Sequence, residues 1–272
     1  MTQVLIKRDG ATLYGVDVGL GPPILFQHGL GGNDQQAAEV FPSNGGYRRL
    51  TLECRGHGSS EPGRLDQLSF TTFADDLLAF LDEAVAERVV AGGISMGAAL
   101  ALRLAVIAPQ RVRALVLARP AWVTKSSPDN LSYFRAVGLM LDDDDREAAR
   151  LRFVASPEGR LLASDAPDNF KSLNGLFAAT RPPWTGSLVR ALAADGPGIT
   201  ESDIRRINVP TLVIGHGRDL AHPFAYSKTL ADMIPRAKLV EITPKANDIE
   251  AYRREFRTAL VSFLDLLPSP PA

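Results

Sequence analysis

The most informative segment of the chain lies at residues 89–99 and reads VVAGGISMGAA. A short apolar run leads into Gly-x-Ser-x-Gly, formed by Gly93, Ser95 and Gly97, and small residues suited to a helix follow. A serine at so sharp a strand-to-helix turn has strained backbone geometry, and the two glycines give it room. Its hydroxyl then stands at a helix N-terminus, where backbone N–H groups stabilise negative charge. The segment predicts a nucleophilic Ser95, with the Met96 N–H positioned to stabilise an oxyanion.

Further apolar runs have the length and bulk of strands that are buried on both faces. They lie at residues 23–26, 50–52, 114–118, 211–214 and 239–242. Helical periodicity occurs at residues 73–86, 96–107, 224–234 and 249–266. Near the N-terminus, alternating residues around Asp9-Gly10 indicate an antiparallel hairpin made of residues 4–7 and 12–18. This alternation of strands and helices predicts an α/β fold, with a mostly parallel central sheet flanked by helices on both faces.

The alternation stops at residues 124–200, where Pro, Ser, Asp and Gly are common and strand-like runs are absent. This segment is long enough for a small helical insertion. Its aromatic residues either cover a pocket or fill the insertion's own core, and they are Phe134, Phe153, Phe170, Phe177 and Trp184. The acidic run at residues 142–145 lacks the spaced carbonyl and Gly partners of a hard-metal site, so it is typical of a solvated helix start.

Composition narrows the classes of function. The 272 residues are 45% hydrophobic and 22% charged, an ordinary globular balance. Thirty Lys and Arg against 31 Asp and Glu give a net charge of -1, so no overall field attracts nucleic acid or anionic lipid. The single cysteine, Cys54, excludes an intramolecular disulfide and a cysteine-ligated metal cluster. Within residues 1–10, the charged Lys7 and Arg8 follow only a few apolar residues, which is too short a run for a signal peptide or membrane span. This favours a soluble cytoplasmic protein.

A glycine-rich loop follows the apolar run at residues 23–26 and reads HGLGG at residues 28–32. Such a loop presents a backbone N–H, and two such donors stabilise an oxyanion. Leu30 is the predicted donor in this loop, alongside Met96. His28 has the character of a hydrogen-bonded structural histidine. A phosphate-cradling function is disfavoured because neither Gly-x-Gly-x-x-Gly nor a following Lys-Ser/Thr is present.

The HGLGG loop, the segment RGHGSS at residues 55–60 and the Gly-x-Ser-x-Gly turn resemble the alpha/beta-hydrolase superfamily in order and spacing. Because Ser95 and not Asp holds the nucleophile position, the chain resembles the esterase, lactonase and carbon–carbon bond hydrolase branches. The resemblance implies an alpha/beta-hydrolase fold in which the insertion is a lid. The implied division is a core at residues 1–123 and 201–266, a helical lid at residues 124–200 and a flexible tail at residues 267–272.

The resemblance also implies an acid and a base that follow Ser95 in the chain. Asp219, in the segment IGHGRD, takes the acid position, where a carboxylate orients a protonated histidine. The histidine itself is missing. Counting back without gaps from the terminal helix places the family position at Ala246, and no histidine occurs after His222. Alanine can neither remove the serine proton nor return it to a leaving group.

Three interpretations stay open. His222, three residues after Asp219, substitutes as the base; or Lys245 or a water does so, which for Lys245 requires a desolvated amine with a lowered pKa. In the third, triad hydrolysis is absent, because the protein has diverged into a ligand-binding or regulatory pseudo-hydrolase or because the chain carries a disabling substitution. His57 belongs to a loop that resembles a structural family motif and is not expected to reach Ser95, and His216 is expected at the strand end before the acid.

The predicted function is that of a serine hydrolase for an ester, lactone or activated carbon–carbon bond of a small apolar or aromatic molecule. The predicted catalytic residues are Ser95, Asp219 and His222. Trp122 and Arg119 follow the strand at residues 114–118 and are expected to contact substrate. Arg119 or Arg181 either pairs with a substrate carboxylate or is a surface or lid salt-bridge residue. A small-molecule substrate is the expected partner, with no metal, no organic cofactor, no nucleic acid and no membrane. The sequence makes no prediction of oligomeric state.

Overall fold

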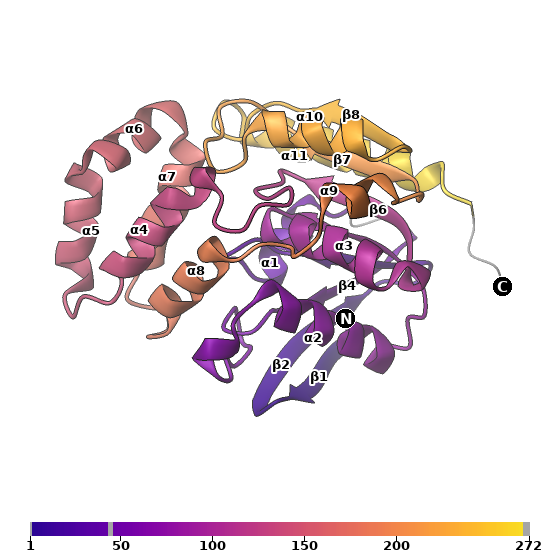
Figure 1. Ribbon diagram of the computed structural model, residues 1–272, viewed down its shortest axis with the longest axis horizontal. Helices are drawn as coiled ribbons and strands as arrows, with labels where there is room; N and C mark the ends of the chain where they lie inside the picture. The colour runs from indigo at the N-terminus through magenta and orange to yellow at the C-terminus, as the bar shows by residue number, and fades with distance from the viewer. Residues whose placement is uncertain (1, 43–45, 269–272) are drawn as a thin grey trace.

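The computed structural model describes residues 2–42 and 46–268, and within them the chain forms an eight-stranded sheet with the order β1-β2-β4-β3-β5-β6-β7-β8 (Figure 1). The strands are β1 (Thr2–Arg8), β2 (Ala11–Val18), β3 (Pro23–Gln27), β4 (Arg48–Leu52), β5 (Val89–Ile94), β6 (Val112–Ala118), β7 (Thr211–Gly215) and β8 (Ala237–Glu241). β2 pairs antiparallel with both β1 and β4, and the remaining pairs are parallel. The predicted mostly parallel sheet is confirmed.

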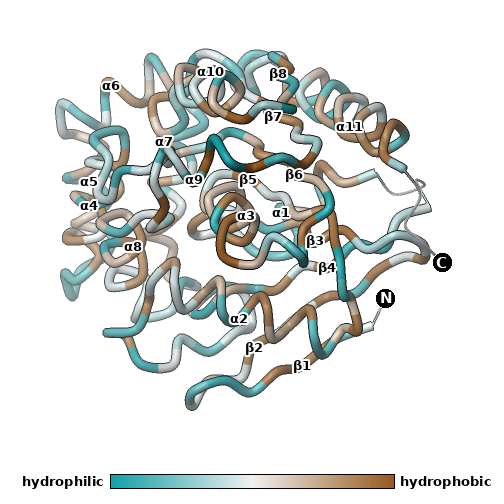
Figure 2. Tube along the Cα trace, turned by 45° about the vertical axis from the view of Figure 1, so that its right-hand side comes forward, coloured by the Kyte–Doolittle hydropathy of each residue, from teal (hydrophilic) through white to brown (hydrophobic). Residues whose placement is uncertain are grey.

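Helices cover both faces of the sheet, and each face has its own apolar core. α2 (Phe70–Glu83), α3 (Met96–Ile107) and α10 (Phe224–Met233) contribute to one core. α1 (Asp34–Val40) and α11 (Ile249–Asp265) contribute to the other. Figure 2 shows α3 near the middle of the molecule, with the strands and other helices around it. Every residue of β5 is buried, as a central strand between two cores requires.

The predicted strands and long helices all occur, with shifts of a few residues at their ends. Two short helices escaped the sequence analysis: α1, of seven residues, and α9 (Glu201–Arg205), of five. Helices this short carry little periodicity, and α9 is held by a capping box between Thr200 and Asp203. β8 begins two residues before the predicted strand because its exposed edge residues blur the apolar run.

The segment between β6 and α9 is helical, as predicted. It contains α4 (Ser132–Met140), α5 (Arg146–Ala155), α6 (Pro157–Asp165), α7 (Pro167–Asn174) and α8 (Thr185–Ala194). In Figure 1 these helices lie together beside the sheet. The Phe153 ring stacks with those of Phe170 and Phe177, with centroids 5.8 Å apart in both pairs. These three aromatic residues therefore fill the insertion's own small core.

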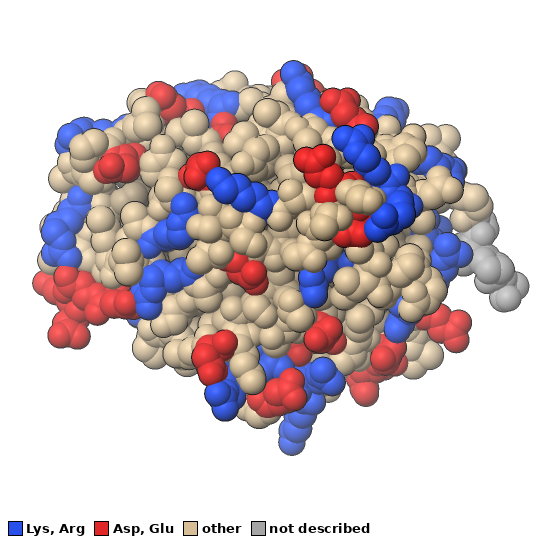
Figure 3. Space-filling view, viewed as in Figure 1, with Lys and Arg blue, Asp and Glu red and all other residues tan. Residues whose placement is uncertain are grey.

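The acidic run at residues 142–145 starts α5 and carries no sign of a metal site. The Asp145 carboxylate accepts a hydrogen bond from the Ala148 N–H at 2.9 Å and so caps the helix. Asp142 and Asp143 form ion pairs with Arg190 and Arg152. Figure 3 shows this acidic group at the edge of the insertion, while both signs of charge mix elsewhere on that face. The described residues hold no cluster of three His, Cys, Asp or Glu side chains suited to a metal.

Three further observations concern the Cys54 thiol, membrane-spanning helices and the C-terminal tail. Burial raises the pKa of the Cys54 thiol, so it stays protonated. Across residues 2–42 and 46–268, no helix combines the length and apolar character needed to cross a membrane. Of the predicted tail at residues 267–272, positions 269–272 lie outside the described residues.

Candidate active site

Ser95 lies at the turn between β5 and α3, in strained backbone geometry. Its φ is +57° and its ψ is −110°, in a region that L residues rarely adopt. The glycines on either side are required by close packing against β3. A Cβ at Gly93 would lie 2.5 Å from the Gln27 carbonyl oxygen, and one at Gly97 would lie 2.4 Å from it. The Ser95 N–H donates to the Ala118 carbonyl at 2.9 Å, which ties the strained turn to β6.

The glycine-rich loop at residues 28–32 runs directly beside this turn. A Cβ added at Gly29 would lie 3.3 Å from the Ser95 Cβ. The Gly29 N–H donates to the Gln36 side-chain oxygen at 2.6 Å, and the Gly32 N–H to the Gly29 carbonyl at 2.9 Å. The loop that carries Leu30 and the helix start that carries Met96 are therefore neighbours. The role of the Leu30 and Met96 backbone N–H groups as oxyanion donors stays a prediction.

His28 is buried and has both ring nitrogens occupied. Nε2 accepts a hydrogen bond from the Cys54 N–H at 3.1 Å, so Nδ1 carries the proton and donates to the Gly29 carbonyl at 2.9 Å. Burial lowers its pKa, and the ring is neutral. These contacts give His28 the structural character that its position in the sequence suggested.

Asp219 follows β7 and is almost completely buried, with its carboxylate enclosed by donors. Arg119 contacts Oδ2 through Nε at 2.8 Å and through its terminal nitrogen at 2.7 Å. Oδ1 accepts from the Asn169 amide at 2.8 Å and from the His222 N–H at 3.1 Å. Burial acts to raise the pKa of Asp219, but the charge of Arg119 and the His222 ring outweigh it and hold the pKa well below its usual range. The carboxylate is therefore ionised.

His222 joins the serine to this carboxylate. Its Nδ1 lies 2.8 Å from Asp219 Oδ1, and its Nε2 lies 2.9 Å from Ser95 Oγ. An ionised carboxylate accepts only, so Nδ1 carries the proton and Nε2 is free to accept the serine hydroxyl proton. The three residues named from the sequence come together in the order serine, imidazole, carboxylate. A general base within hydrogen-bond reach of a serine hydroxyl can activate it for attack.

No described contact joins the loop after β8, where the family histidine was expected, to Ser95, Asp219 or His222. Its Asn247 side-chain oxygen accepts a hydrogen bond from Arg218, the residue before Asp219, at 2.7 Å. Ala246 lies in a turn that the Asn247 N–H closes on the Pro244 carbonyl at 2.9 Å. The Lys245 ammonium lies 3.7 Å from the Glu39 carboxylate and 5.8 Å from the Tyr252 ring centre. Lys245 is thus directed toward Glu39 and Tyr252, and no described contact joins it to Ser95.

Arg119 and Trp122 have placements that differ from the predicted substrate contacts. Arg119 has a φ of +46°, and its guanidinium lies between Asp219 and the Tyr252 ring, 6.0 Å from the ring centre. The Asp219 carboxylate thus pairs with Arg119, where a substrate carboxylate had been predicted. Trp122 is 1% exposed, packs edge-to-face on Phe70 and donates its indole N–H to the Asp195 carbonyl at 3.0 Å. It is placed as a packing residue.

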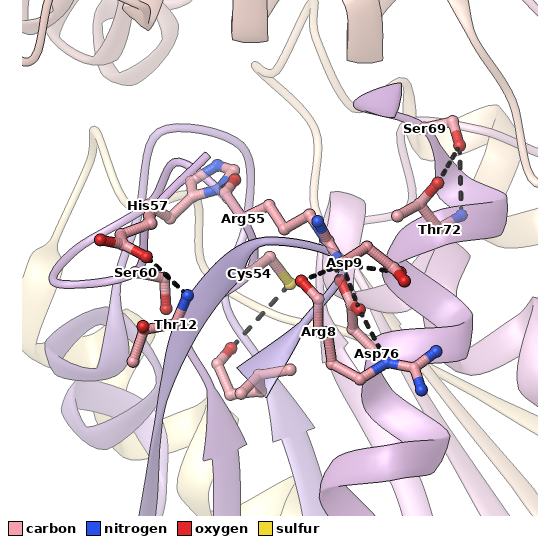
Figure 4. A network of polar contacts seen from close by, with 12 residues as sticks. Arg8, Asp9, Thr12, Cys54, Arg55, His57, Ser60, Ser69, Thr72 and Asp76 are labelled. Carbon is pink, nitrogen blue, oxygen red and sulfur yellow. Dashed lines mark hydrogen bonds and ion pairs between the residues drawn. The ribbon is translucent and has the colours of Figure 1, made fainter. Parts of the chain in front are cut away.

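His57 and His216, the remaining histidines, are buried. The His57 Nδ1 donates to the Arg55 carbonyl at 3.0 Å, and burial lowers the pKa of His57 to about 3. Figure 4 shows Arg55 extending away from His57 to form a buried ion pair with Asp76, at 2.6 Å. This pair fixes the loop at residues 55–60. His216 lies 3.8 Å from Asp219 on the side opposite His222, and burial followed by the charge of Arg119 lowers its pKa.

Asn169 is the functional candidate that sequence analysis missed. It lies on α7, in the insertion, and is 3% exposed. Its amide nitrogen donates to Asp219 Oδ1, and its amide oxygen accepts from the Ala221 N–H at 2.9 Å. Both ends of one side chain are thus bound to the loop that carries Asp219 and His222. Fifty residues separate Asn169 from Asp219 and no local motif marks it, so only the tertiary structure reveals it.

Comparison with known proteins supplies a family match and several relatives. The model described as the alpha/beta hydrolase fold matches residues 22–247. The 2-hydroxymuconate semialdehyde hydrolase of Pseudomonas sp. (strain CF600) is 33% identical over 237 residues, which is 82% of this chain and 79% of that protein. The non-heme chloroperoxidase CPO-A1 of Kitasatospora aureofaciens is 29% identical over 279 residues, covering 96% of this chain and 99% of that protein.

Solved structures give the same answer for the fold. The enol-lactonase from Burkholderia xenovorans LB400 superimposes with a TM-score of 0.72 at 22% identity, over 96% of this chain and all of that one. A hydrolase from Pseudomonas aeruginosa PA01 superimposes with a TM-score of 0.71 at 24% identity, over 96% of this chain and 98% of that one. At these identities the likeness is one of fold.

Proposed function

Because the chain belongs to the alpha/beta hydrolase fold family and is a hydrolase, we propose that it works through Ser95 as a nucleophile, with His222 as the base. The observation that carries this proposal is the chain of contacts from Ser95 Oγ to His222 Nε2 at 2.9 Å and from His222 Nδ1 to Asp219 at 2.8 Å. The missing histidine at Ala246 is then replaced by one from the loop that carries the acid. The substrate is an ester, a lactone or an activated carbon–carbon bond of a small apolar or aromatic molecule.

In the proposed reaction, Ser95 Oγ attacks the substrate carbonyl and His222 Nε2 takes the hydroxyl proton. The Leu30 and Met96 N–H groups stabilise the oxyanion that forms. The imidazolium returns the proton to the leaving group, and the acyl group stays on Ser95. Water then attacks the acyl-enzyme, with His222 again as base. Throughout, ionised Asp219 keeps the proton on Nδ1 and stabilises the imidazolium.

Arg119 and Asn169 are positioning residues in this proposal. Arg119 occupies Oδ2 of Asp219, so Oδ1 is the oxygen that faces His222. Asn169 holds the same Oδ1 from the insertion. Trp184 on the insertion donates its indole N–H to the Gly56 carbonyl of the core at 3.1 Å. These contacts between insertion and core support a lid at residues 124–200 over the active site.

One relative supports the choice of a small-molecule substrate, since the protein with 33% identity is named a 2-hydroxymuconate semialdehyde hydrolase. We include a cytoplasmic location in the proposal, and cell fractionation checks it.

Labelling with a fluorophosphonate tests the proposal without knowledge of the substrate. The reagent reacts with an activated serine, so the parent protein should be labelled on Ser95 and Ser95→Ala should not. His222→Ala should slow labelling strongly, while Lys245→Gln should leave the rate unchanged. A parent protein that resists labelling while folded would contradict the proposal and favour a ligand-binding pseudo-hydrolase.

A further inference from the structure

A cavity of about 440 Å³ lies between two glycine-containing loops of the core and the insertion. The core contributes residues 31–33 and 56–58, and the insertion contributes residues between 175 and 189. We call it the glycine-loop cavity. Among the described residues that line it, Arg181 is the one Lys or Arg, and no Asp or Glu is present. The cavity therefore has a cationic wall.

The insertion holds arginines of two kinds. Three form ion pairs, namely Arg150 with Glu147, Arg152 with Asp143 and Arg190 with Asp142. The others donate to backbone carbonyls, as Arg135, Arg146 and Arg160 do.

Arg181 is of the second kind and donates one terminal N–H to the Gly31 carbonyl at 2.9 Å. Burial lowers the pKa of Arg181. Among the described residues no carboxylate forms an ion pair with its guanidinium; Asp144 and Glu147 line a second hollow that Arg181 also borders. A partly buried, unpaired cation is costly unless a ligand supplies the anion.

The cavity wall is close to Ser95. Gly31 is two residues from Gly29, and a Cβ at Gly29 would lie 3.3 Å from the Ser95 Cβ. Two residues of chain span at most about 7 Å. An anionic group held by Arg181 would therefore lie on the same loop that packs against Ser95.

We infer that Arg181 recognises a carboxylate of the substrate, so that the hydrolase acts on short carboxylated substrates such as half-esters of dicarboxylic acids. This inference rests on the proposed function, since it assumes that Ser95 is the nucleophile. A guanidinium presents a fork of donors that matches a carboxylate. One positive charge balances one carboxylate, whereas a phosphate dianion would need a second cation that the cavity wall does not contain.

Matched esters test this inference. Each charged substrate is a mono-p-nitrophenyl ester of succinate, glutarate or adipate, and its control is the same molecule with the free carboxylate masked as a methyl ester. A second pair, 4-carboxyphenyl butyrate and its methyl ester, places the charge on the leaving group. At least one charged substrate should exceed its masked control in kcat/KM by about tenfold. Hydrogen bonds to charged groups correspond to roughly 10- to 100-fold in such ratios.

Arg181→Gln should reduce this ratio of charged to masked substrate by about tenfold or more, and Arg181→Lys should keep part of it. Lys171→Gln is the matched control, because Lys171 is an exposed cation on the same insertion, and it should leave the ratio unchanged. A ratio near one in the parent for every pair would overturn the inference. So would an equal loss of charged and masked turnover in Arg181→Gln, since Arg181 would then merely support the Gly31 loop.

Binding to an inactive protein separates this inference from the proposed function. Monomethyl glutarate is titrated calorimetrically into Ser95→Ala and into Ser95→Ala/Arg181→Gln. The inference expects binding to weaken by about tenfold when Arg181 is lost, and equal binding would overturn it. The proposed function fails on a different result, namely ester turnover that persists undiminished in Ser95→Ala.

Discussion

The loop after β7 and the loop after β8 carry different shares of the chemistry. The first, at residues 216–223, holds both Asp219 and His222, and the His222 ring reaches Ser95 at 2.9 Å. The second, at residues 242–248, is where the family resemblance implied the base, yet it holds Ala246 and a lysine paired with Glu39. In the proposed function, the base therefore stands on the loop that carries the acid and not on the loop after β8.

This placement is possible because the acid and the base share one short loop. The Asp219 Oδ1 accepts both the His222 N–H at 3.1 Å and the His222 ring N–H at 2.8 Å. Their relative position is thus set locally, within four residues. In the arrangement that the resemblance implied, by contrast, two separate loops would have to meet. Arg119 and Asn169 hold the short loop against the sheet and the insertion.

The largest expected effect is that of Ser95→Ala. Ser95 is the proposed nucleophile, so ester hydrolysis should fall by at least about 10⁴-fold, to the level that the oxyanion donors and binding supply. Thermal stability should change little, because alanine keeps the same backbone φ of +57° and loses only the Oγ contact with His222. Steady-state kinetics with p-nitrophenyl butyrate and a thermal melt check both parts. Full activity in the variant would remove Ser95 from the mechanism.

Asp219→Asn sharpens the comparison within the loop after β7. An amide at this position no longer fixes the proton on His222 Nδ1, so kcat should fall by about 10³-fold with a small change in KM. Lys245→Gln, in the loop after β8, should change kcat less than about twofold. The reverse ranking of these two variants would show that the second loop supplies the base.

Asn169→Ala is expected to have an intermediate effect on kcat, and it tests whether the insertion positions Asp219. Loss of its hydrogen bond to Asp219 should lower kcat by about tenfold, since bonds to a charged acceptor are worth about 1.5–3 kcal/mol. Asn169→Asp should be worse, because it places a second carboxylate at Oδ1. The two variants are compared by kcat and KM at one pH. If both variants retain the parent kcat, the insertion does not position the acid.

The smallest expected effect concerns the pH dependence of stability and comes from buried His57. The pKa of His57 is about 3 in the folded protein and 6.5 in an unfolded chain, so below pH 6.5 the unfolded state binds the extra proton. The free energy of unfolding should therefore fall as pH decreases from 6.5 toward 4.5, by about 1.4 kcal/mol per pH unit from this residue. Urea denaturation at several pH values measures the slope. His57→Asn should make it shallower, and an unchanged slope would contradict the assignment.

Much of the fold was predictable because buried parallel strands leave continuous apolar runs, as in β5 and β7. A local motif also made Ser95 a candidate, the family resemblance made Asp219 one, and the short spacing from Asp219 added His222. The sequence alone could not choose between His222 and Lys245. That choice depends on which side chain the loops direct toward Ser95, which is a tertiary property.

Other parts of the site depend wholly on long-range contacts. Arg119 was expected to meet a substrate carboxylate, but it meets Asp219, 100 residues further along the chain. Trp122 was expected near substrate and is packed against Phe70. Asn169 belongs to an insertion whose sequence predicts helices but not their orientation. In each case the sequence showed a polar or aromatic residue but did not show which residue it contacts.

The most direct test of the account is a comparison of kcat/KM for p-nitrophenyl butyrate in His222→Ala and Ala246→His. The account predicts that His222→Ala loses at least about 10³-fold, because no other group accepts the Ser95 proton. Ala246→His, in a protein that already has its base, should change turnover less than about threefold. Undiminished turnover in His222→Ala, together with a gain of orders of magnitude in Ala246→His, would contradict it and show that the parent protein lacks a working base.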